Sequence, residues 1–508
     1  MINDKGKPLA YRRNMQNSSN QKYFFPFLAV VLIFLTIAYY SNSAQSFIPK
    51  DRSETFNVKI IPSDLTDANL AELDQQLFSY VAVIDAGSSG CRAHVYRYGK
   101  LGSITGPLYV LPQHQSFKVK PGLSSFATNP SDAGASLEKL VDFIKQQVPE
   151  GVWKDTPIWL KATAGLRMLE KSTSSEILLS VRNFLKDSTK SPFYFKPHYA
   201  QIISGSEEGA FGWIAFNYLK KVIGPKKVGN VLPYAVVEMG GASSQVSQVA
   251  PSKAEADLIP PEYKYSFNVE EEEFNLYTYS YLGYGAEQGR EGVNKQLSTA
   301  QVAKTDLMDP CLYNGYKRQG VRKDPYEGPL VTSLTGTSSD KLCVEEVSKL
   351  FASDRSTCQV KGPMSFNCIP QPAFVTSSPN FLVFENFYYL SSAIGVKADA
   401  ETSTTDSKFP LITTPNEIYR ATAKVCNMSW SEVQTTYPLD DQGKDTNLKW
   451  CFSGSYAYSF LTKGLGIPID KRITVQKFVD GSEIEWALGA ALKEASDFLK
   501  RNNLRQQP

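Results

Sequence analysis

Two glycine-rich turns, each directly after a short apolar strand that ends in a carboxylate, are the residues of this chain best suited to chemistry. The first turn consists of Asp85 followed by Gly87, Ser88, Ser89 and Gly90, and the second of Glu238 followed by Gly240, Gly241, Ala242 and Ser243. Small residues let backbone N–H groups crowd around an anion, serine hydroxyls add donors, and a carboxylate can hold a hydrated cation. Two such turns predict a phosphate chain and its cation held from both sides, and therefore phosphoryl transfer.

The cation expected at these turns is Mg²⁺ or Ca²⁺, because carboxylate and water oxygens suit hard divalent ions. Asp85 and Glu238 are the candidates for positioning it, in part through water. The alternative is that each acid only binds its own turn. His94, His114 and His198 are the only histidines and have no ligand spacing among them, so a histidine–zinc site is not expected.

A candidate general base lies in the segment Ser204-Gly205-Ser206-Glu207-Glu208-Gly209. Adjacent acids at a helix start often only compensate the helix dipole. Beside two phosphate turns, however, a Ser-Gly turn that presents carboxylates is a source of a general base. The sequence contains no G-x-x-x-x-G-K-[ST] motif, so the geometry of a P-loop is excluded.

The elements that must position these residues alternate between strand and helix from about Phe78 onward, which predicts an α/β fold. The 508 residues suffice for two domains, and a net charge of +3 without a basic stripe argues against a nucleic-acid partner. The expected organisation is a cytoplasmic tail (1–22), a transmembrane anchor (23–40), a stalk (41–75), a first lobe (76–205, completed by 470–500) and a second lobe with a disulfide-rich region (206–469).

Tyr23 to Tyr40 form an uncharged, mostly apolar run close to the roughly 20 residues that cross a bilayer. Five lysines and arginines precede the run and only Asp4 opposes them, so the remaining chain is expected in a lumen or outside the cell. A cleaved signal peptide is the alternative, because Ser41 to Ser46 is rich in small residues. A single membrane helix is favoured because the run is longer than a signal-peptide core.

Cysteine usage fits this secretory location. Cys91 lies in the first turn, where a small buried residue is expected, and the others are Cys311, Cys343, Cys358, Cys368, Cys426 and Cys451. An even number in one region predicts three disulfides, and nearest-neighbour pairing is the economical choice among the many that six cysteines allow. Asn427-Met428-Ser429 is a candidate glycosylation site.

The chain resembles the apyrase family, the nucleoside tri- and diphosphate diphosphohydrolases. The family's motifs appear in order as IDAGSSGCRAHVY (84–96), KATAGLRML (161–169), ISGSEEGAFGW (203–213), VEMGGASSQV (237–246), and the closing pair LGYGAEQGR (282–290) and EWALGAAL (485–492). The resemblance covers nearly all of residues 78–495. It implies a two-lobed, actin-like (ribonuclease H-like) α/β fold with central mixed sheets and the active site in the interlobe cleft.

The resemblance also implies roles for individual residues. Glu208 matches the catalytic base, Thr163 a residue that holds the attacking water, and Gln245 a residue near water and metal. Tyr388 and Tyr456 match aromatics that sandwich the base. The phosphate-binding positions fall on Ser88, Ser89, Gly90, Gly240, Gly241, Ala242 and Ser243. The cysteine pattern supports the sequential disulfide pairing.

Three positions depart from the family pattern. Glu238 replaces the usual Asp, Cys91 replaces Ser or Thr, and Lys161 stands where a small residue is more common. None of these changes removes a required group, so an active enzyme is expected.

The expected activity is metal-dependent hydrolysis of the terminal phosphate of nucleoside di- and triphosphates by direct water attack. A single N-terminal anchor fits a Golgi enzyme that clears GDP and UDP. The alternatives are an extracellular ATP/ADP apyrase, an inactive nucleotide-binding protein, a sugar kinase and a polyphosphatase. Oligomeric state and preferred base are left open.

Overall fold

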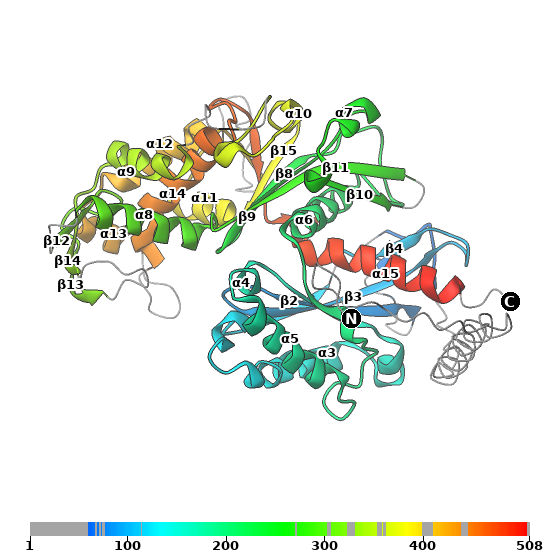
Figure 1. Ribbon diagram of the computed structural model, residues 1–508. Helices are drawn as coiled ribbons and strands as arrows, with labels where there is room; N and C mark the ends of the chain where they lie inside the picture. Colours follow the sequence, from blue (N-terminus) through cyan, green and yellow to red (C-terminus); the bar gives the residue numbers. More distant parts are fainter. Residues whose placement is uncertain are drawn as a thin grey trace, which may run out of the picture. The chain divides into compact units, whose positions relative to one another are not determined.

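Two seven-stranded mixed sheets form the framework of the protein (Figure 1). The computed structural model describes residues 59–66, 69–70, 73, 77–112, 114–269, 272–301, 306–322, 331–352, 358, 362–398, 410–437 and 446–504. The expected tail (1–22) and membrane anchor (23–40) lie outside the described residues. Within the described ranges, no helix has the length and apolar composition needed to cross a membrane.

The first sheet carries the first glycine turn. Its strands, in spatial order, are β1 (Ile60–Ile61), β3 (Cys91–Leu101), β2 (Ser79–Ala86), β6 (Ile158–Ala162) and β7 (Ala200–Ile202), with β4 (Leu108–Val110) and β5 (Gln115–Val119) also paired to β3. β2, β6 and β7 are parallel, and β2 and β6 are nearly continuous apolar runs because both faces are covered. Helices α3 (Glu138–Gln147) and α5 (Lys171–Lys186) cover one face (Figure 1).

β1 lies within the segment expected to be a stalk (41–75). Ile60 and Ile61 pair in parallel with Lys100 and Leu101 of β3, and Ile61 is buried. Two adjacent isoleucines suffice to extend the edge of the sheet, so at least this part of the expected stalk belongs to the fold.

The second sheet carries the second glycine turn. Its spatial order is β10 (Lys264–Val269), β11 (Glu272–Leu282), β9 (Ser243–Val249), β8 (Ala235–Met239), β15 (Phe381–Glu385), β17 (Ile473–Val475) and β16 (Leu411–Thr413). The segment 470–500 was expected to complete the first lobe. Instead, β17 pairs with β15 in the second sheet, whereas Glu483 and the helix Trp486–Leu504 contact the first sheet. The lobe boundaries otherwise remain a prediction.

Helices α6 (Gly205–Leu219) and α15 (Trp486–Leu504) lie between the two sheets (Figure 1). α6 is buried from Glu208 to Leu219 because it packs on β9 and β11 on one side and contacts α15 through Phe211 and Trp486 on another. Glycines make this close packing possible. A Cβ at Gly209 would lie 2.8 Å from Ser247 Oγ, and one at Gly489 only 2.1 Å from the Phe211 carbonyl oxygen.

An ion pair between Lys161 of β6 and Glu494 fixes α15 on the first sheet. Lys161 Nζ lies 2.6 Å from Glu494 Oε1, and both side chains are buried. This contact explains the unusual lysine in the second motif, since its long side chain reaches α15 rather than the cleft.

We expect Lys161→Met to lower the free energy of unfolding by about 3–5 kcal/mol, because a buried carboxylate loses this cation. The double variant Lys161→Met/Glu494→Leu should recover most of the loss, as measured by denaturant unfolding. A double variant as unstable as the single one would contradict this role for the pair.

A helical region adjoins the second sheet and contains all three disulfides. Its elements are α8 (Ala286–Ala300), α9 (Asp340–Ser348), α11 (Asn386–Ile394), α12 (Pro415–Cys426), α13 (Trp430–Thr436), α14 (Trp450–Ser459) and a small sheet of β12 (Asp306–Asp309), β14 (Val331–Gly336) and β13 (Lys317–Arg322). The bridges are Cys311–Cys343, Cys358–Cys368 and Cys426–Cys451, so sequential pairing is confirmed. Cys91 is buried and not bridged.

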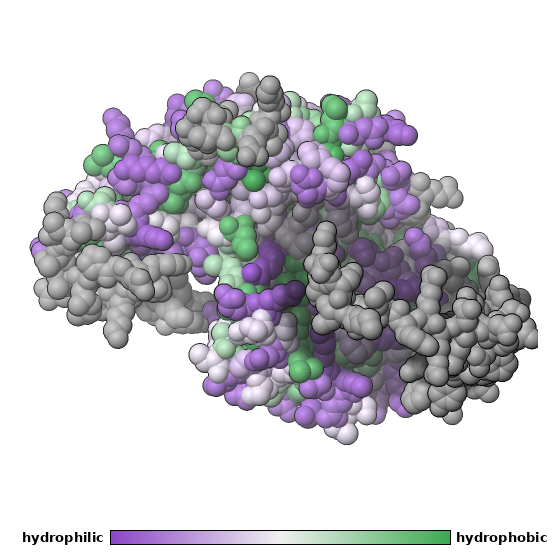
Figure 2. Space-filling view, viewed as in Figure 1, coloured by the Kyte–Doolittle hydropathy of each residue, from purple (hydrophilic) through white to green (hydrophobic). Residues whose placement is uncertain are grey.

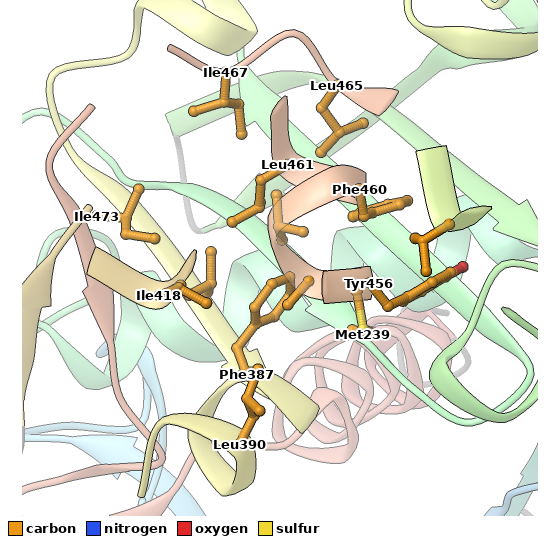
Figure 3. Packing of buried hydrophobic residues seen from close by; sticks show 14 of the residues in the cluster. Met239, Phe387, Leu390, Ile418, Tyr456, Phe460, Leu461, Leu465, Ile467 and Ile473 are labelled. Carbon is orange, nitrogen blue, oxygen red and sulfur yellow. The ribbon is translucent and has the colours of Figure 1, made fainter. Parts of the chain in front are cut away.

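The buried core of this half joins α11, α12 and α14 to the second sheet (Figure 3). The remaining α-helices and strands of the described residues are α4 (Ala164–Arg167), α7 (Lys253–Asp257), α10 (Ala373–Ser377), β18 (Phe478–Val479) and β19 (Ser482–Glu483). Polar side chains predominate on the face shown in Figure 2, and its apolar residues occur in small groups among the coloured atoms.

Candidate active site

A polar cavity of about 150 Å³ lies where the carboxyl ends of strands from both sheets meet. Asp85 and Glu238 are the penultimate residues of β2 and β8, Thr163 follows β6, and Glu385 ends β15. In sheets with parallel strands, this edge is where ligands bind. The remaining lining residues are Gly87, Ser88, Ser89, Gly90, Arg92, Lys118, Ala164, Glu208, Gly240, Gly241, Ala242, Ser243, Glu485, Trp486 and Ala487.

The two glycine turns face each other across this cavity. A Cβ at Gly241 of the second turn would lie only 3.4 Å from Ser88 Oγ of the first, and 2.9 Å from Glu287 Oε2. The second turn is braced from behind, because the Ala286 and Glu287 N–H groups at the start of α8 donate to the Gly240 and Gly241 carbonyls. The predicted phosphate-binding residues therefore come together at one place.

Glu208 enters the cavity from the start of α6. A capping box between Ser204 and Glu207 begins the helix and directs the Glu207 carboxylate back onto the cap, which leaves Glu208 as the acid of the pair in the cavity. The Arg167 Nη2 donates to Glu208 Oε2 at 2.6 Å, and the same guanidinium reaches the Ile203 carbonyl and Ser243 Oγ. Burial raises the pKa of Glu208, and Arg167 opposes the rise.

Several buried oxygens in and behind the cavity have no hydrogen-bond partner: Asp85 Oδ1, Glu238 Oε2, Gln245 Oε1 and both carboxylate oxygens of Glu485. Burial raises the pKa of Asp85 to about 7, with the Glu208 carboxylate as the next cause. Burial and then Glu208 also raise the pKa of Glu238 well above its usual range. These clustered oxygens repel one another and lack hydrogen-bond partners. They are suitable ligands for a hard divalent cation, which would neutralise the repulsion between the carboxylates.

This arrangement predicts a pH dependence of stability in the metal-free protein. The pKa of Asp85 is higher in the folded protein (about 7) than its ordinary value of 3.8, so its contribution to stability is greatest at low pH. We expect that contribution to decline from about pH 4 to about pH 7, by about 1.4 kcal/mol per unit of pKa difference. The measurement is denaturant unfolding of wild type and Asp85→Asn in chelator. If the free energy of unfolding changed equally with pH in the two proteins, the pKa assigned to Asp85 would be wrong. Saturating Mg²⁺ should reduce the pH dependence of the unfolding free energy of wild type.

Two other residues assigned from the family motifs lie beside the cavity. Thr163 is buried, and its N–H donates to the Ala86 carbonyl at 3.2 Å, which holds it against the first turn. Gln245 lies directly behind the second turn, where its Nε2 donates to Ser243 Oγ at 2.6 Å and to Ser280 Oγ at 3.1 Å. Both positions are consistent with the roles that the resemblance implies.

Tyr456 does not fit the expected role in base binding. It is 0% exposed, and its hydroxyl donates to the Tyr284 carbonyl at 2.9 Å. Its ring packs in the core beside Phe460 (Figure 3). No face remains on which a base could stack, because α14 is buried between neighbouring helices. Tyr388 on α11 is half-buried, whereas its neighbour Tyr389 is 42% exposed and accepts a hydrogen bond from Lys477.

Four charged residues of the cavity were not among the predicted site residues: Arg92, Lys118, Glu385 and Glu485. Glu385 carried a signal, because Phe381–Glu385 repeats the pattern of an apolar strand that ends in an acid. Its φ of +58° is an unfavourable conformation for a non-glycine residue. Burial raises its pKa. Arg92 and Lys118 bring positive charge to the wall beside the first turn.

Asn427 is exposed just after α12, and Ser429 caps α13, so the sequon lies at an accessible helix junction. Its glycosylation remains a prediction.

Two acid–glycine turns that face each other at the carboxyl ends of two mixed sheets, with a carboxylate held by an arginine beside them, define an enzyme that acts on phosphoryl groups. Residues 71–507 match the model of the GDA1/CD39 (nucleoside phosphatase) family, and the chain belongs to that family.

Among its relatives are the guanosine-diphosphatase of Schizosaccharomyces pombe, 31% identical over 442 residues (82% of this chain, 74% of the relative), and probable apyrase 4 of Arabidopsis thaliana, 30% identical over 430 residues (81% and 78%). Another is the mouse ectonucleoside triphosphate diphosphohydrolase 3, 31% identical over 445 residues (81% and 77%). A nucleoside triphosphate hydrolase from Neospora caninum has a similar fold, with a TM-score of 0.60 and 16% identity over 84% of this chain and 93% of that chain.

Proposed function

We propose that this protein hydrolyses the terminal phosphoanhydride of nucleoside di- and triphosphates with a divalent cation, by direct attack of water. The observation that carries the proposal is the convergence of both glycine turns and Glu208 on one cavity, where Asp85 Oδ1 and Glu238 Oε2 are buried without a hydrogen-bond partner. Guanosine-diphosphatases and apyrases among the relatives support the substrate class.

The turns would bind the terminal phosphates. Backbone N–H groups and the hydroxyls of Ser88, Ser89 and Ser243 are the donors available at the cavity wall. Asp85 and Glu238 would hold Mg²⁺ or Ca²⁺, in part through water, and the ion would neutralise charge on the phosphate oxygens.

Glu208 would act as the general base. Its raised pKa makes it a better proton acceptor from water than an ordinary glutamate, while Arg167 fixes its orientation. Thr163 and Gln245 would hold the water in line. A phosphorylated enzyme intermediate is not required, because the water reaches phosphorus directly.

The three disulfides and the N-terminal apolar segment support a secretory location, with the catalytic region in the lumen of the Golgi as the first choice. There the enzyme would clear GDP or UDP. A secreted or cell-surface apyrase acting on ATP and ADP is the second candidate.

Phosphate release by the full-length protein tests this proposal. The substrates are GDP, UDP, ADP, ATP, GTP and tripolyphosphate, each with Mg²⁺, Ca²⁺ or chelator. We expect cation-dependent release from nucleotides, with GDP and UDP preferred. Preference for ATP and ADP would favour the surface apyrase, and preference for tripolyphosphate a polyphosphatase. Nucleotide binding without release would favour an inactive binding protein.

A further inference from the structure

Three side chains from distant parts of the sequence converge beside the cavity, and one of them, Glu485, lines it. His94 lies on β3, His114 directly before β5, and Glu485 directly before α15; one ligand atom from each lies within 4.8 Å of the others. His94 Nδ1 is 3.1 Å from His114 Nε2 and 2.9 Å from Glu485 Oε2. His94 and Glu485 are only 1% and 6% exposed, so the group is compact and largely shielded from water.

This group has more lone pairs than hydrogens to share. His114 Nδ1 lies 3.2 Å from the Pro112 carbonyl oxygen, which can only accept, so this nitrogen carries the proton and Nε2 presents a lone pair to the group. The Glu485 carboxylate also only accepts. His94 Nδ1 faces both acceptors, and it can donate its one hydrogen to only one of them at a time.

The carboxylate of Glu485 is a second, independent reason to expect a bound ion, because it has charged neighbours but no hydrogen bond. Its oxygens lie at ion-pair distance from His94 and Arg92, yet neither contact has the geometry of a hydrogen bond. A buried carboxylate without hydrogen bonds is costly, and native proteins satisfy such groups with few exceptions.

We propose that His94, His114 and Glu485 bind a divalent transition-metal ion, with Zn²⁺ as the best fit, at a site separate from Asp85 and Glu238. Two ligand atoms that each lie about 2 Å from one ion are separated by about 3 Å. The distances from His94 to His114 and to Glu485 match this value, and the ligand atoms of His114 and Glu485 lie within 4.8 Å of each other. Two imidazole nitrogens and one carboxylate oxygen favour zinc-type ions over Mg²⁺ or Ca²⁺. The Pro112 carbonyl would orient His114 from behind, as is common for histidine ligands.

A bound ion would connect parts of the chain that are nearly 400 residues apart in sequence. It would tie β3 to the start of α15, the helix that packs between the two sheets. Because the ion binds only the folded protein at these three ligands, it should raise thermal stability with increasing concentration.

The test uses full-length protein stripped with chelator and kept in excess Mg²⁺, which occupies the carboxylate site. Zn²⁺ is titrated calorimetrically, and Co²⁺ is added as a spectroscopic probe. The proteins are wild type, His114→Gln, Glu485→Gln and the matched control His198→Gln, which removes the exposed histidine outside the group.

We expect wild type and His198→Gln to bind one further equivalent of Zn²⁺, to gain thermal stability and to show visible Co²⁺ absorption. His114→Gln and Glu485→Gln should lose at least tenfold in affinity together with the Co²⁺ bands. The proposal is overturned if wild type binds no such equivalent, or if both ligand variants bind Zn²⁺ as wild type does. Circular dichroism of the two variants separates a lost ligand from a lost fold.

Discussion

Glu208→Gln should lower kcat for nucleotide hydrolysis by about 10²- to 10⁴-fold, the range for losing a general base. The amide keeps the size of the side chain and can still contact Arg167, but it cannot take a proton from water. Nucleotide affinity should change little, since the proposed mechanism assigns Glu208 to the attacking water rather than to the phosphates. Steady-state phosphate release and equilibrium nucleotide binding measure the two effects separately.

Glu207→Gln is the matched control, because it removes the same charge one residue away. The Glu207 carboxylate accepts from the Ser204 N–H at 2.8 Å in the capping box, so its loss should lower stability by about 1 kcal/mol at most and leave kcat within a few-fold. If both variants lost activity equally, the effect would reflect the charge at the helix start, and Glu208 would not be the base.

Asp85→Asn and Glu238→Gln should each lower kcat by about 10³-fold, equivalent to about 4 kcal/mol of transition-state stabilisation. Both substitutions remove an anionic oxygen from the proposed cation site. The half-saturating concentration of Mg²⁺ should rise at least tenfold. In chelator, by contrast, both variants should be as stable as wild type or more so, because they relieve repulsion among buried carboxylates.

Glu483→Gln controls for the loss of a carboxylate near the cavity. Glu483 pairs with Lys477 at 2.8 Å and lies outside the cavity lining, so its variant should keep the wild-type dependence on Mg²⁺. Variants of Asp85 and Glu238 with unchanged Mg²⁺ dependence would show that the cation binds elsewhere.

The cavity could be predicted from sequence to the extent that its residues follow local rules. An apolar strand, an acid and a small-residue turn occur together at Asp85 and at Glu238, and the folded chain places both turns at one cavity. The Ser-Gly turn before Glu207 and Glu208 likewise indicates a source of a general base, and the resemblance to the apyrase family selects Glu208. Such patterns are local, so they can be recognised without knowledge of the tertiary structure.

Features that depend on contacts between distant parts of the chain could not be predicted from local sequence patterns. His94, His114 and Glu485 have no ligand spacing, because pairing of β3 with β5 and the position of α15 bring them together. Tyr456 matched a family position, but only the packing of α14 shows that its ring is buried. β1 is too short to have a periodicity of its own, and the long β3 strand provides its edge.

Hydrolysis in ¹⁸O-labelled water by wild type and Glu208→Gln, with products analysed by mass spectrometry, shows which phosphorus atom the water attacks and whether Glu208 assists it. We expect one ¹⁸O atom in the released phosphate, none in the nucleotide product, and a rate that falls with Glu208→Gln and with chelator. Label in the nucleotide product would mean that water attacks the inner phosphorus. Turnover that is unchanged in the Glu208 variant would contradict the assignment of this cavity as the active site.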